Sequence, residues 1–410
     1  MNAKPRTAFF CDTFHEVNGV ALTARQLVAF AERHEYPMLA VHPGPNLAQI
    51  ERGSIRRIEL QRGRASFGIE RDLSYDLHLW RFLPALRKEL AEFRPDVVHV
   101  TSPGDFGQLG AILTHEMQLP LVVSWHTNLH QFGARRLKKL LQFLPEEAAD
   151  SAASFAERMA LRLMLRFYKI ARVVLAPTRA QVRWLEKATG KPGFLMVRGV
   201  DSELFHPQKR TCHDDILRLG FVGRVTPEKG VCLFPRIEQA LLDAGIRRFQ
   251  IVIIGDGSER EGLQGKLRHG VFRGVLLGQE LAEAYANLDL FVFPSRTDTF
   301  ANVIQEAAAS GVPAVVTTDG GPKNLIVAGV TGYAEWTDEA FVRRVVELAK
   351  APEKLRQMGK AAREMVRQAT WDAALAPVFE AYRHCQTLHR SSAARPPKLA
   401  AIPSVQVPYL

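Results

Sequence analysis

The chain lacks the segments that would assign it to a membrane-spanning or an extracellular class. No apolar run comes near the roughly 18 residues that a helix needs to cross a bilayer. Only four cysteines occur among 410 residues, and no two of them stand at the spacing of a metal site. Such scattered thiols are typical of a reducing compartment. We therefore expect a cytoplasmic protein without structural disulfides.

The common motifs of metal-assisted phosphate chemistry are also missing. The sequence has no Asp-x-Asp at a strand end placed for a diphosphate-bound metal, no histidine cluster at ligand spacing and no Walker lysine motif. The sequence therefore offers no common motif for a metal that binds a diphosphate. The formal net charge of +11 favours anionic partners, but charge alone does not choose among nucleotides, nucleic acid and acidic lipid.

Strand and helix signals alternate along the chain in two series, and 410 residues exceed one ordinary core. The first series runs from Ala8 to Val197 and the second from Leu217 to Val316, with an expected strand at 274–277. Crossover units of this kind imply parallel sheets. We expect an α/β protein with two facing Rossmann-like domains at 1–205 and 206–371. A helix at 372–389 should cross back to the first domain, before a disordered tail at 390–410.

The most informative segment follows the apolar run Leu290-Phe291-Val292-Phe293, which predicts a buried parallel strand. Thr299 is the predicted cap of a helix from Asn302 to Ser310. Asp298 and Glu306 should then flank the helix mouth, where the amides of Phe300, Ala301 and Asn302 favour a phosphate. Carboxylates beside an anion cradle suit a nucleotide joined through diphosphate to a sugar.

Two further turns of the second series carry candidate ligand groups. Arg224 and Lys229 lie in Gly223-Arg224-Val225-Thr226-Pro227-Glu228-Lys229-Gly230, directly after a strand. Two fixed cations there would neutralise a departing diphosphate. The alternative is a solvated turn with two surface cations. Gly255, in Gly255-Asp256-Gly257, could approach a nucleotide, although this tripeptide is also a common tight turn.

The first series offers a phosphate-binding turn and a histidine. Asn18-Gly19-Val20 opens a helix after the first strand, which can present amides to phosphate. Ser124-Trp125-His126-Thr127-Asn128 leaves another strand at its carboxyl end, so His126 should face the cleft and bond a sugar hydroxyl. A structural histidine is the alternative.

Residues 133–172 combine basic and leucine-rich patterns. One group is a compact run and the other repeats every three or four residues on a helix: Arg135, Arg136, Lys138 and Lys139, then Arg158, Arg162, Arg166 and Lys169. Such a pattern predicts an interfacial helix on an anionic membrane, at its inner face. The alternative is a surface helix that packs one face on its domain.

Taken together, these motifs resemble a GT-B glycosyltransferase of family 4, the retaining group whose signature is Glu, seven residues, Glu. The resemblance covers about residues 6 to 389 and also includes Gly199-Val200-Asp201 with Leu204, Phe205 and Pro207. Its Ser-x-His-Thr-Asn segment is most like bacterial members that mannosylate or glucosylate lipids. Two positions depart from the pattern, since Asp298 replaces the first glutamate and Ala301 replaces a glycine.

The resemblance implies metal-independent transfer of a hexose from a nucleotide sugar to a lipid or glycan, with retention of the alpha anomer. No cofactor and no nucleic-acid partner are implied. Glu306 should hold the ribose hydroxyls and Asp298 the donor sugar. Arg224 and Lys229 should hold the diphosphate, with Gly19 approaching from the other domain and His126 contacting the sugar.

Two other functions stay open at the level of the sequence. A GT-B-shaped nucleotide-sugar epimerase or hydrolase would need the same donor residues but no acceptor. A non-catalytic protein could use its basic first domain on an anionic surface. The presence of both carboxylates and both cations argues against the second of these.

Overall fold

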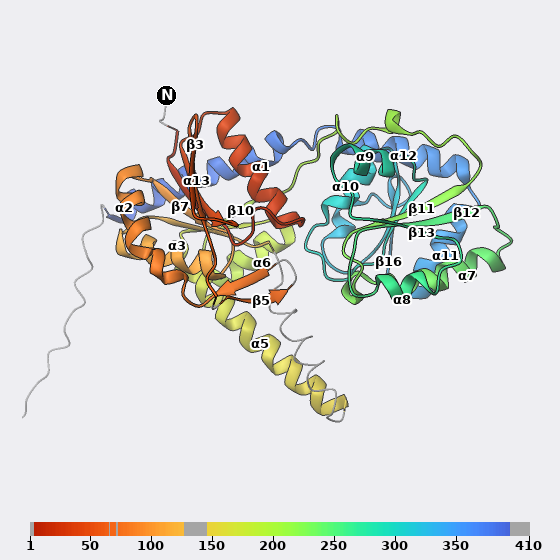
Figure 1. The fold of residues 1–410 in the computed structure, drawn as a ribbon, viewed down its shortest axis with the longest axis horizontal. Helices are drawn as coiled ribbons and strands as arrows, with labels where there is room; N and C mark the ends of the chain where they lie inside the picture. The colour runs from red at the N-terminus through yellow and green to blue at the C-terminus, as the bar shows by residue number, and fades with distance from the viewer. Residues whose placement is uncertain (1–3, 65, 71–72, 127–145, 394–410) are drawn as a thin grey trace, which may run out of the picture.

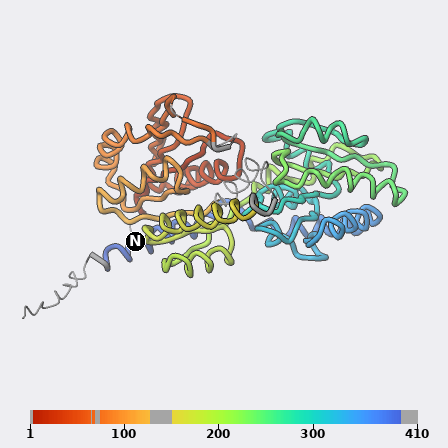
Figure 2. Tube along the Cα trace, turned by 90° about the horizontal axis from the view of Figure 1, so that it is seen from below, coloured from red at the N-terminus to blue at the C-terminus, as the bar shows by residue number. Residues whose placement is uncertain are grey.

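A computed structural model describes residues 4–64, 66–70, 73–126 and 146–393. Figure 1 shows two α/β domains side by side, with the N-terminal domain mostly in red to yellow and the C-terminal domain in green to blue. Figure 2 shows the same pair from below. None of the described helices combines the length and the hydropathy that spanning a bilayer requires.

The N-terminal domain is built on an eight-stranded sheet within the described residues, in the order β10-β9-β8-β7-β1-β2-β4-β3. All neighbours are parallel except β3 and β4. A separate hairpin pairs β5 with β6. The strands of this domain are β1 Thr7–Phe10, β2 Met38–Pro43, β3 Ala48–Arg52, β4 Ile55–Leu60, β5 Ser66–Glu70, β6 Leu73–Asp76, β7 Val97–Val100, β8 Leu121–Ser124, β9 Val173–Ala176 and β10 Gly193–Leu195.

The C-terminal domain has a parallel sheet in the order β13-β12-β11-β14-β15-β16. Its strands are β11 Leu217–Val222, β12 Phe249–Ile254, β13 Gly270–Gly274, β14 Leu290–Phe293, β15 Ala314–Thr317 and β16 Gly332–Glu335. The predicted strand at 274–277 is wrong. Gly274 ends β13 with φ +68°, and Val275 and Leu277 are more than half exposed.

Helices cover both sheets. Those of the N-terminal half are α1 Gly19–Arg33, α2 Leu83–Phe93, α3 Asp105–Glu116, α5 Glu146–Ile170 and α6 Arg179–Thr189. Those of the C-terminal half are α7 Phe234–Asp243, α8 Arg260–Gln264, α9 Gly278–Ala286, α10 Asn302–Ala309, α11 Asp338–Ala349, α12 Pro352–Val366 and α13 Trp371–Ala393. Short 3-10 turns occupy Leu79–Phe82, Pro207–Lys209, Pro227–Lys229, Val231–Leu233 and Pro322–Leu325.

Strand β1 shows why the N-terminal sheet is buried on both faces. Ala8 and Phe10 pack into one apolar cluster, whereas Phe9 and Cys11 pack into another on the opposite face. Continuous apolar strands are expected when helices cover both faces of a parallel sheet. The predicted α/β class with two Rossmann-like, parallel-sheet domains is therefore confirmed.

The last helix joins the two halves. α13 comes after the C-terminal domain but contacts α1 and the strands β7 to β10 of the N-terminal sheet. The two connections between the domains lie against each other, because the Val200 amide donates to the carbonyl of Ala369 at 2.8 Å. Val200 and Phe205 already belong to the core of the C-terminal domain. The tail 394–410 lies outside the described residues.

Candidate active site

The carboxyl edge of the C-terminal sheet is formed by loops whose backbones touch. A Cβ on Gly255 would lie 1.9 Å from the carbonyl oxygen of Gly223, and one on Gly230 would lie 2.4 Å from that of Pro294. Similarly, Gly321 packs on the backbone of Thr299. Only glycine permits such close approaches without displacing backbone. The glycines that the sequence marked as possible ligand turns therefore also fix the spacing of the loops.

Asp298 and Lys229 form an ion pair at this edge. The Lys229 Nζ donates to both carboxylate oxygens of Asp298, at 2.7 and 2.8 Å. Ser295 donates a further hydrogen bond to the same carboxylate. Burial alone would raise the pKa of Asp298, but Lys229, Ser295 and the nearby Arg224 together hold it below its usual value. Asp298 is thus a firmly ionised acceptor.

Arg224 completes a cationic pair with Lys229. Its guanidinium lies 3.4 Å from the carboxylate of Glu228, which also accepts a hydrogen bond from Thr226. Both cations act on the pKa of Asp298, so the structure brings all three predicted residues together. A diphosphate that bound here would have to share Lys229 with Asp298.

Glu306 lies on α10 and is partly buried. One of its oxygens, Oε2, accepts a hydrogen bond from the hydroxyl of Tyr285 on α9 at 2.9 Å. Burial raises the pKa of Glu306 to about 7, although the Tyr285 hydrogen bond acts in the opposite direction. The other oxygen is therefore left as an acceptor for a ligand hydroxyl.

The start of α10 differs in one detail from the prediction. Thr299 does not cap the helix, because the N-cap position is Ala301 and no side chain caps it. Thr299 instead donates to the carbonyl of His126 in the other domain, at 2.7 Å.

Ala301 has φ +73°, the left-handed region that favours glycine, which costs a non-glycine residue about 1–2 kcal/mol. The first amides of α10, including that of Asn302, are those that any helix leaves without intrahelical partners.

On the opposite side, Gly19 begins α1. The side chain of Asn18 caps this helix by accepting from the amides of Val20 and Ala21 at 3.1 and 2.9 Å. A Cβ on Gly19 would lie 3.1 Å from the guanidinium of Arg198. Gly19 thus faces the space between the domains from the N-terminal side, close to a third cation.

His126 ends a buried chain of hydrogen bonds. Its Nε2 lies 2.7 Å from the Ser124 hydroxyl, which lies 2.9 Å from Nε2 of His99. The other ring nitrogen of His99 lies 2.8 Å from the hydroxyl of Tyr382 on α13. Burial, followed by the charge of Arg198, lowers the pKa of His126 well below its usual value. His126 is therefore a neutral imidazole; Thr127 and Asn128 lie outside the described residues.

Arg198 is the main residue that the sequence did not predict. It follows β10, is almost fully buried, and lies over the ring of Phe300 at 5.6 Å and 3.3 Å from Oδ1 of Asn302. Its Nε and the Asn302 Nδ2 are buried without a partner. Burial lowers its pKa to about 10, so it stays charged at neutral pH. Its place after a parallel strand was the only signal in the sequence.

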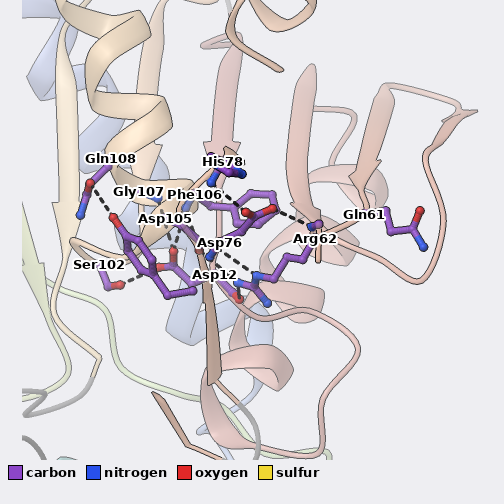
Figure 3. A network of polar contacts seen from close by, with 12 residues as sticks. Asp12, Gln61, Arg62, Asp76, His78, Ser102, Asp105, Phe106, Gly107 and Gln108 are labelled. Atoms are coloured by element: carbon purple, nitrogen blue, oxygen red, sulfur yellow. Dashed lines mark hydrogen bonds and ion pairs between the residues drawn. The ribbon is translucent and has the colours of Figure 1, made fainter. Parts of the chain in front are cut away.

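A second group that the sequence missed is an acidic network in the N-terminal domain, shown in Figure 3. Asp12 accepts from the hydroxyl of Ser102 and the amide of Phe106, while Arg62 binds Asp105 through two 3.0 Å contacts. Burial, and then the neighbouring charge of Asp105, raises the pKa of Asp12 to about 6. Asp105 also accepts from the backbone of the β5–β6 hairpin, so this network ties the hairpin to α3.

Of the two predicted basic segments, the structure describes only the second, which lies on α5. The run Arg135, Arg136, Lys138 and Lys139 lies outside the described residues. On α5 all four predicted cations are exposed, namely Arg158, Arg162, Arg166 and Lys169. Exposed apolar side chains accompany them, namely Phe155, Met159, Leu163 and Ile170. In Figure 1 one end of α5 packs on the N-terminal domain, whose core includes Met164 and Tyr168, and the other end projects beyond the domain.

Comparison with known proteins agrees with this geometry. Residues 17–204 match the model of Glycosyltransferase Family 4, and residues 217–351 match that of Glycosyl transferases group 1. The chain belongs to glycosyltransferase family 4. The predicted resemblance is therefore confirmed, and the protein is a hexosyltransferase of this type that uses a nucleotide-sugar donor.

Two curated relatives span nearly the whole chain. It is 29% identical over 395 residues to a GDP-mannose-dependent alpha-mannosyltransferase of Corynebacterium glutamicum, covering 92% of this chain and 88% of the relative. It is 30% identical over 382 residues to a protein of the same name from Mycobacterium tuberculosis, covering 89% and 93%. A solved sucrose-phosphate synthase of Thermosynechococcus elongatus shares the fold, with TM-score 0.69 and 19% identity over 95% of this chain and 100% of that one.

Proposed function

We propose that the protein transfers mannose from GDP-mannose to a lipid or glycan acceptor, with retention of configuration and without a metal. The observation that carries the proposal is that Lys229 and Arg224 act on Asp298 directly before α10, the helix that also bears Glu306. The names of the two mannosyltransferase relatives supply the choice of GDP-mannose. A nucleotide sugar has a ribose, a diphosphate and a hexose, and the site offers distinct groups for each.

In this proposal Glu306 accepts hydrogen bonds from the ribose hydroxyls, since Tyr285 occupies only one of its oxygens. Arg224, Lys229 and the amides at the start of α10 bind the diphosphate. Asp298 accepts from a hydroxyl of the donor hexose. As the bond to the sugar breaks, negative charge grows on the leaving diphosphate, and fixed cations are most effective there.

His126 contacts the hexose from the other domain. Because Ser124 occupies its Nε2, the ring nitrogen available to a sugar hydroxyl is Nδ1. A neutral imidazole can accept or donate such a bond without adding charge. The acceptor hydroxyl attacks from the face that the diphosphate leaves, and a phosphate oxygen takes its proton. No side chain is needed as general base.

The test is to incubate the purified protein with GDP-mannose, UDP-glucose or ADP-glucose, each with and without membrane lipid and glycan acceptors. We expect release of GDP only when an acceptor is present, and an alpha linkage in the product by NMR. Consumption of donor without acceptor would instead support the epimerase or hydrolase. No consumption under any condition would support a non-catalytic binding protein.

We further propose that α5 holds the enzyme at an anionic membrane, where a lipid acceptor would lie. The four exposed cations and the exposed apolar side chains of α5 share one helix. Each Lys or Arg near an anionic surface contributes about 1 kcal/mol, so four contribute about 4 kcal/mol, or roughly a thousandfold in binding.

Vesicle co-sedimentation tests this docking. The variant changes Arg158, Arg162, Arg166 and Lys169 to Ser, and a matched control changes four exposed cations of the other domain, Arg247, Arg248, Arg343 and Lys350. With phosphatidylglycerol vesicles at low salt, we expect the control to pellet like wild type and the α5 variant to stay in solution. Equal pelleting of all three proteins would refute the role of α5.

A further inference from the structure

Three residues far apart in the sequence meet at the carboxyl edge of the N-terminal sheet. His15 follows β1, His42 lies in β2 and Glu59 lies in β4. His42 and Glu59 are opposite each other in the parallel pairing of β2 with β4. One ligand atom from each of the three residues lies within 4.8 Å of the other two, and the His15 Nε2 is 3.1 Å from the Glu59 Oε1.

His42 is already oriented as metal-binding histidines are. Its side chain is fully buried, and its Nδ1 lies 3.0 Å from the carbonyl oxygen of Pro43. A carbonyl can only accept, so Nδ1 carries the proton and Nε2 has a lone pair. That buried Nε2 has no partner. A histidine that ligates a metal almost always donates its other ring nitrogen in this way.

The surroundings hold these groups in place and leave a route from solvent. The ring of Phe14 stacks on that of His42 with centroids 3.8 Å apart. A Cβ on Gly44 would lie 2.6 Å from a carboxylate oxygen of Glu59, so the backbone there packs directly on this side chain. The side chain of Glu59 is 10% exposed, whereas that of His15 is 48% exposed. An ion could therefore enter past His15.

We propose that His15, His42 and Glu59 bind a zinc ion, with water as the remaining ligand. Two imidazoles and one carboxylate are a ligand set that zinc accepts, with bonds of about 2.0–2.2 Å. Ligand atoms in a tetrahedral site are then about 3.3 Å apart, so His15 and Glu59 already have the required spacing. All three ligand atoms lie within 4.8 Å of one another, so the remaining distances need to shorten by at most about 1.5 Å for zinc to bind.

Other properties of the cluster agree with this assignment. The Nδ1 of His42 is bound to the Pro43 carbonyl, so its Nε2 is the nitrogen left for an ion. The alternative is a plain ion pair between His15 and Glu59, but that arrangement gives the Nε2 of His42 nothing to bind. Bound zinc would fix the loop after β1, four residues before Gly19. The site is separate from Asp298, Lys229 and Glu306, so this inference does not rest on the proposed function.

Zinc titration of the full-length protein tests the inference. The protein carries Cys232→Ser, since Cys232 is an exposed thiol that could bind zinc itself, and is stripped with EDTA and dialysed. Competition against a chromophoric chelator should show one zinc per chain. His15→Gln should weaken zinc binding by at least about 100-fold. Loss of an outer-shell partner already costs up to about 100-fold, and His15 is a direct ligand in the proposed site. The exposed His115→Gln is the matched control and should bind as the parent does.

Cobalt binding gives a second measurement. Its visible bands would not depend on His42 and Glu59 if these residues had only a structural role. Co²⁺ added to the stripped parent should produce the intense visible bands of a tetrahedral site, and these bands should be lost in His42→Gln and in Glu59→Gln. If His42→Gln does not fold, the exposed His15→Gln still decides. The proposal is overturned if the parent binds no stoichiometric zinc, or if His15→Gln and Glu59→Gln bind zinc as tightly as His115→Gln.

Discussion

The carboxyl edges of the two sheets face each other, and the charge of their polar side chains differs. On the C-terminal side they are charged and paired, as in the contact between Lys229 and Asp298. On the N-terminal side the buried imidazoles are neutral. Burial lowers the pKa of His99 to about 3 and that of His126 well below its usual value.

In the proposed function, this difference separates two tasks. A diphosphate needs positive charge that is already fixed in place, and Lys229 and Arg224 at the C-terminal edge would supply it. Hydroxyl groups need hydrogen bonds but no charge, which a neutral imidazole supplies at the N-terminal edge. The N-terminal half also carries charged side chains, namely the Arg62–Asp105 pair and Arg198, and Arg198 is a cation that lies against Phe300 and Asn302 of the other domain. The predictions below test whether the residues at each edge perform the proposed task.

The largest effect is expected for Lys229→Ala. Removing one fixed donor from a developing negative charge costs about 10²- to 10³-fold in kcat. Steady-state kinetics with saturating donor measures this loss. The exposed Lys266→Ala, in the same domain, should leave kcat unchanged. A kcat within about twofold of wild type for Lys229→Ala would remove this residue from the diphosphate site.

Glu306→Ala should act mainly on donor binding. A hydrogen bond to a charged group is worth about 1.5–3 kcal/mol, or roughly ten- to 150-fold in affinity. Calorimetric titration with GDP and with GDP-mannose measures the change, with the exposed Glu261→Ala as control. Because the ribose is common to both ligands, both affinities should fall equally. Unchanged affinity for GDP would contradict the assignment.

Arg198→Met should separate function from stability. Arg198 is a buried cation with an unpartnered Nε, so an apolar side chain of similar volume should keep or raise the free energy of unfolding. Activity should nevertheless fall at least about tenfold, because a cation beside the donor is lost. The exposed Arg183→Met is the control. Loss of stability together with full activity in the folded fraction would make Arg198 purely structural.

The smallest effect concerns pH. Because the folded-state pKa of Glu306 is about 7, above its usual 4.5, the folded protein binds more protons between these values than the unfolded chain. Its stability should therefore fall as pH rises from about 4.5 to 7, by about 1–3 kcal/mol for this group. Glu306→Gln lacks that contribution, so urea denaturation should show the wild type losing more stability than the variant over this range. Parallel curves would mean that Glu306 titrates normally.

Local patterns predicted most of the framework. The strand Leu290–Phe293 was predicted to the residue, because short apolar runs between turn residues are buried in a parallel sheet. The strand predicted at 274–277 is wrong because apolar residues can also lie exposed beyond a glycine that ends a strand. Asp298, Glu306 and the two cations were predicted to lie at one sheet edge because they follow strands in sequence, and the structure brings Asp298 and the two cations together there.

What the sequence did not predict depends on contacts between distant segments. Arg198 gains its environment only when Phe300 and Asn302 of the other domain close around it. Thr299 looked like a helix cap, yet its partner is the carbonyl of His126, 173 residues away. The same is true of His15, His42 and Glu59, whose proximity follows from the pairing of β2 with β4. No local spacing rule contains such information.

The most direct test of the account is mannosyl transfer in the presence of EDTA. Turnover of GDP-mannose with a membrane acceptor is measured before and after chelation, and then after addition of Mg²⁺ or Mn²⁺. If Arg224 and Lys229 supply the positive charge as proposed, turnover should continue in EDTA and should not increase with either metal. Loss of turnover on chelation that Mg²⁺ or Mn²⁺ restores would contradict it.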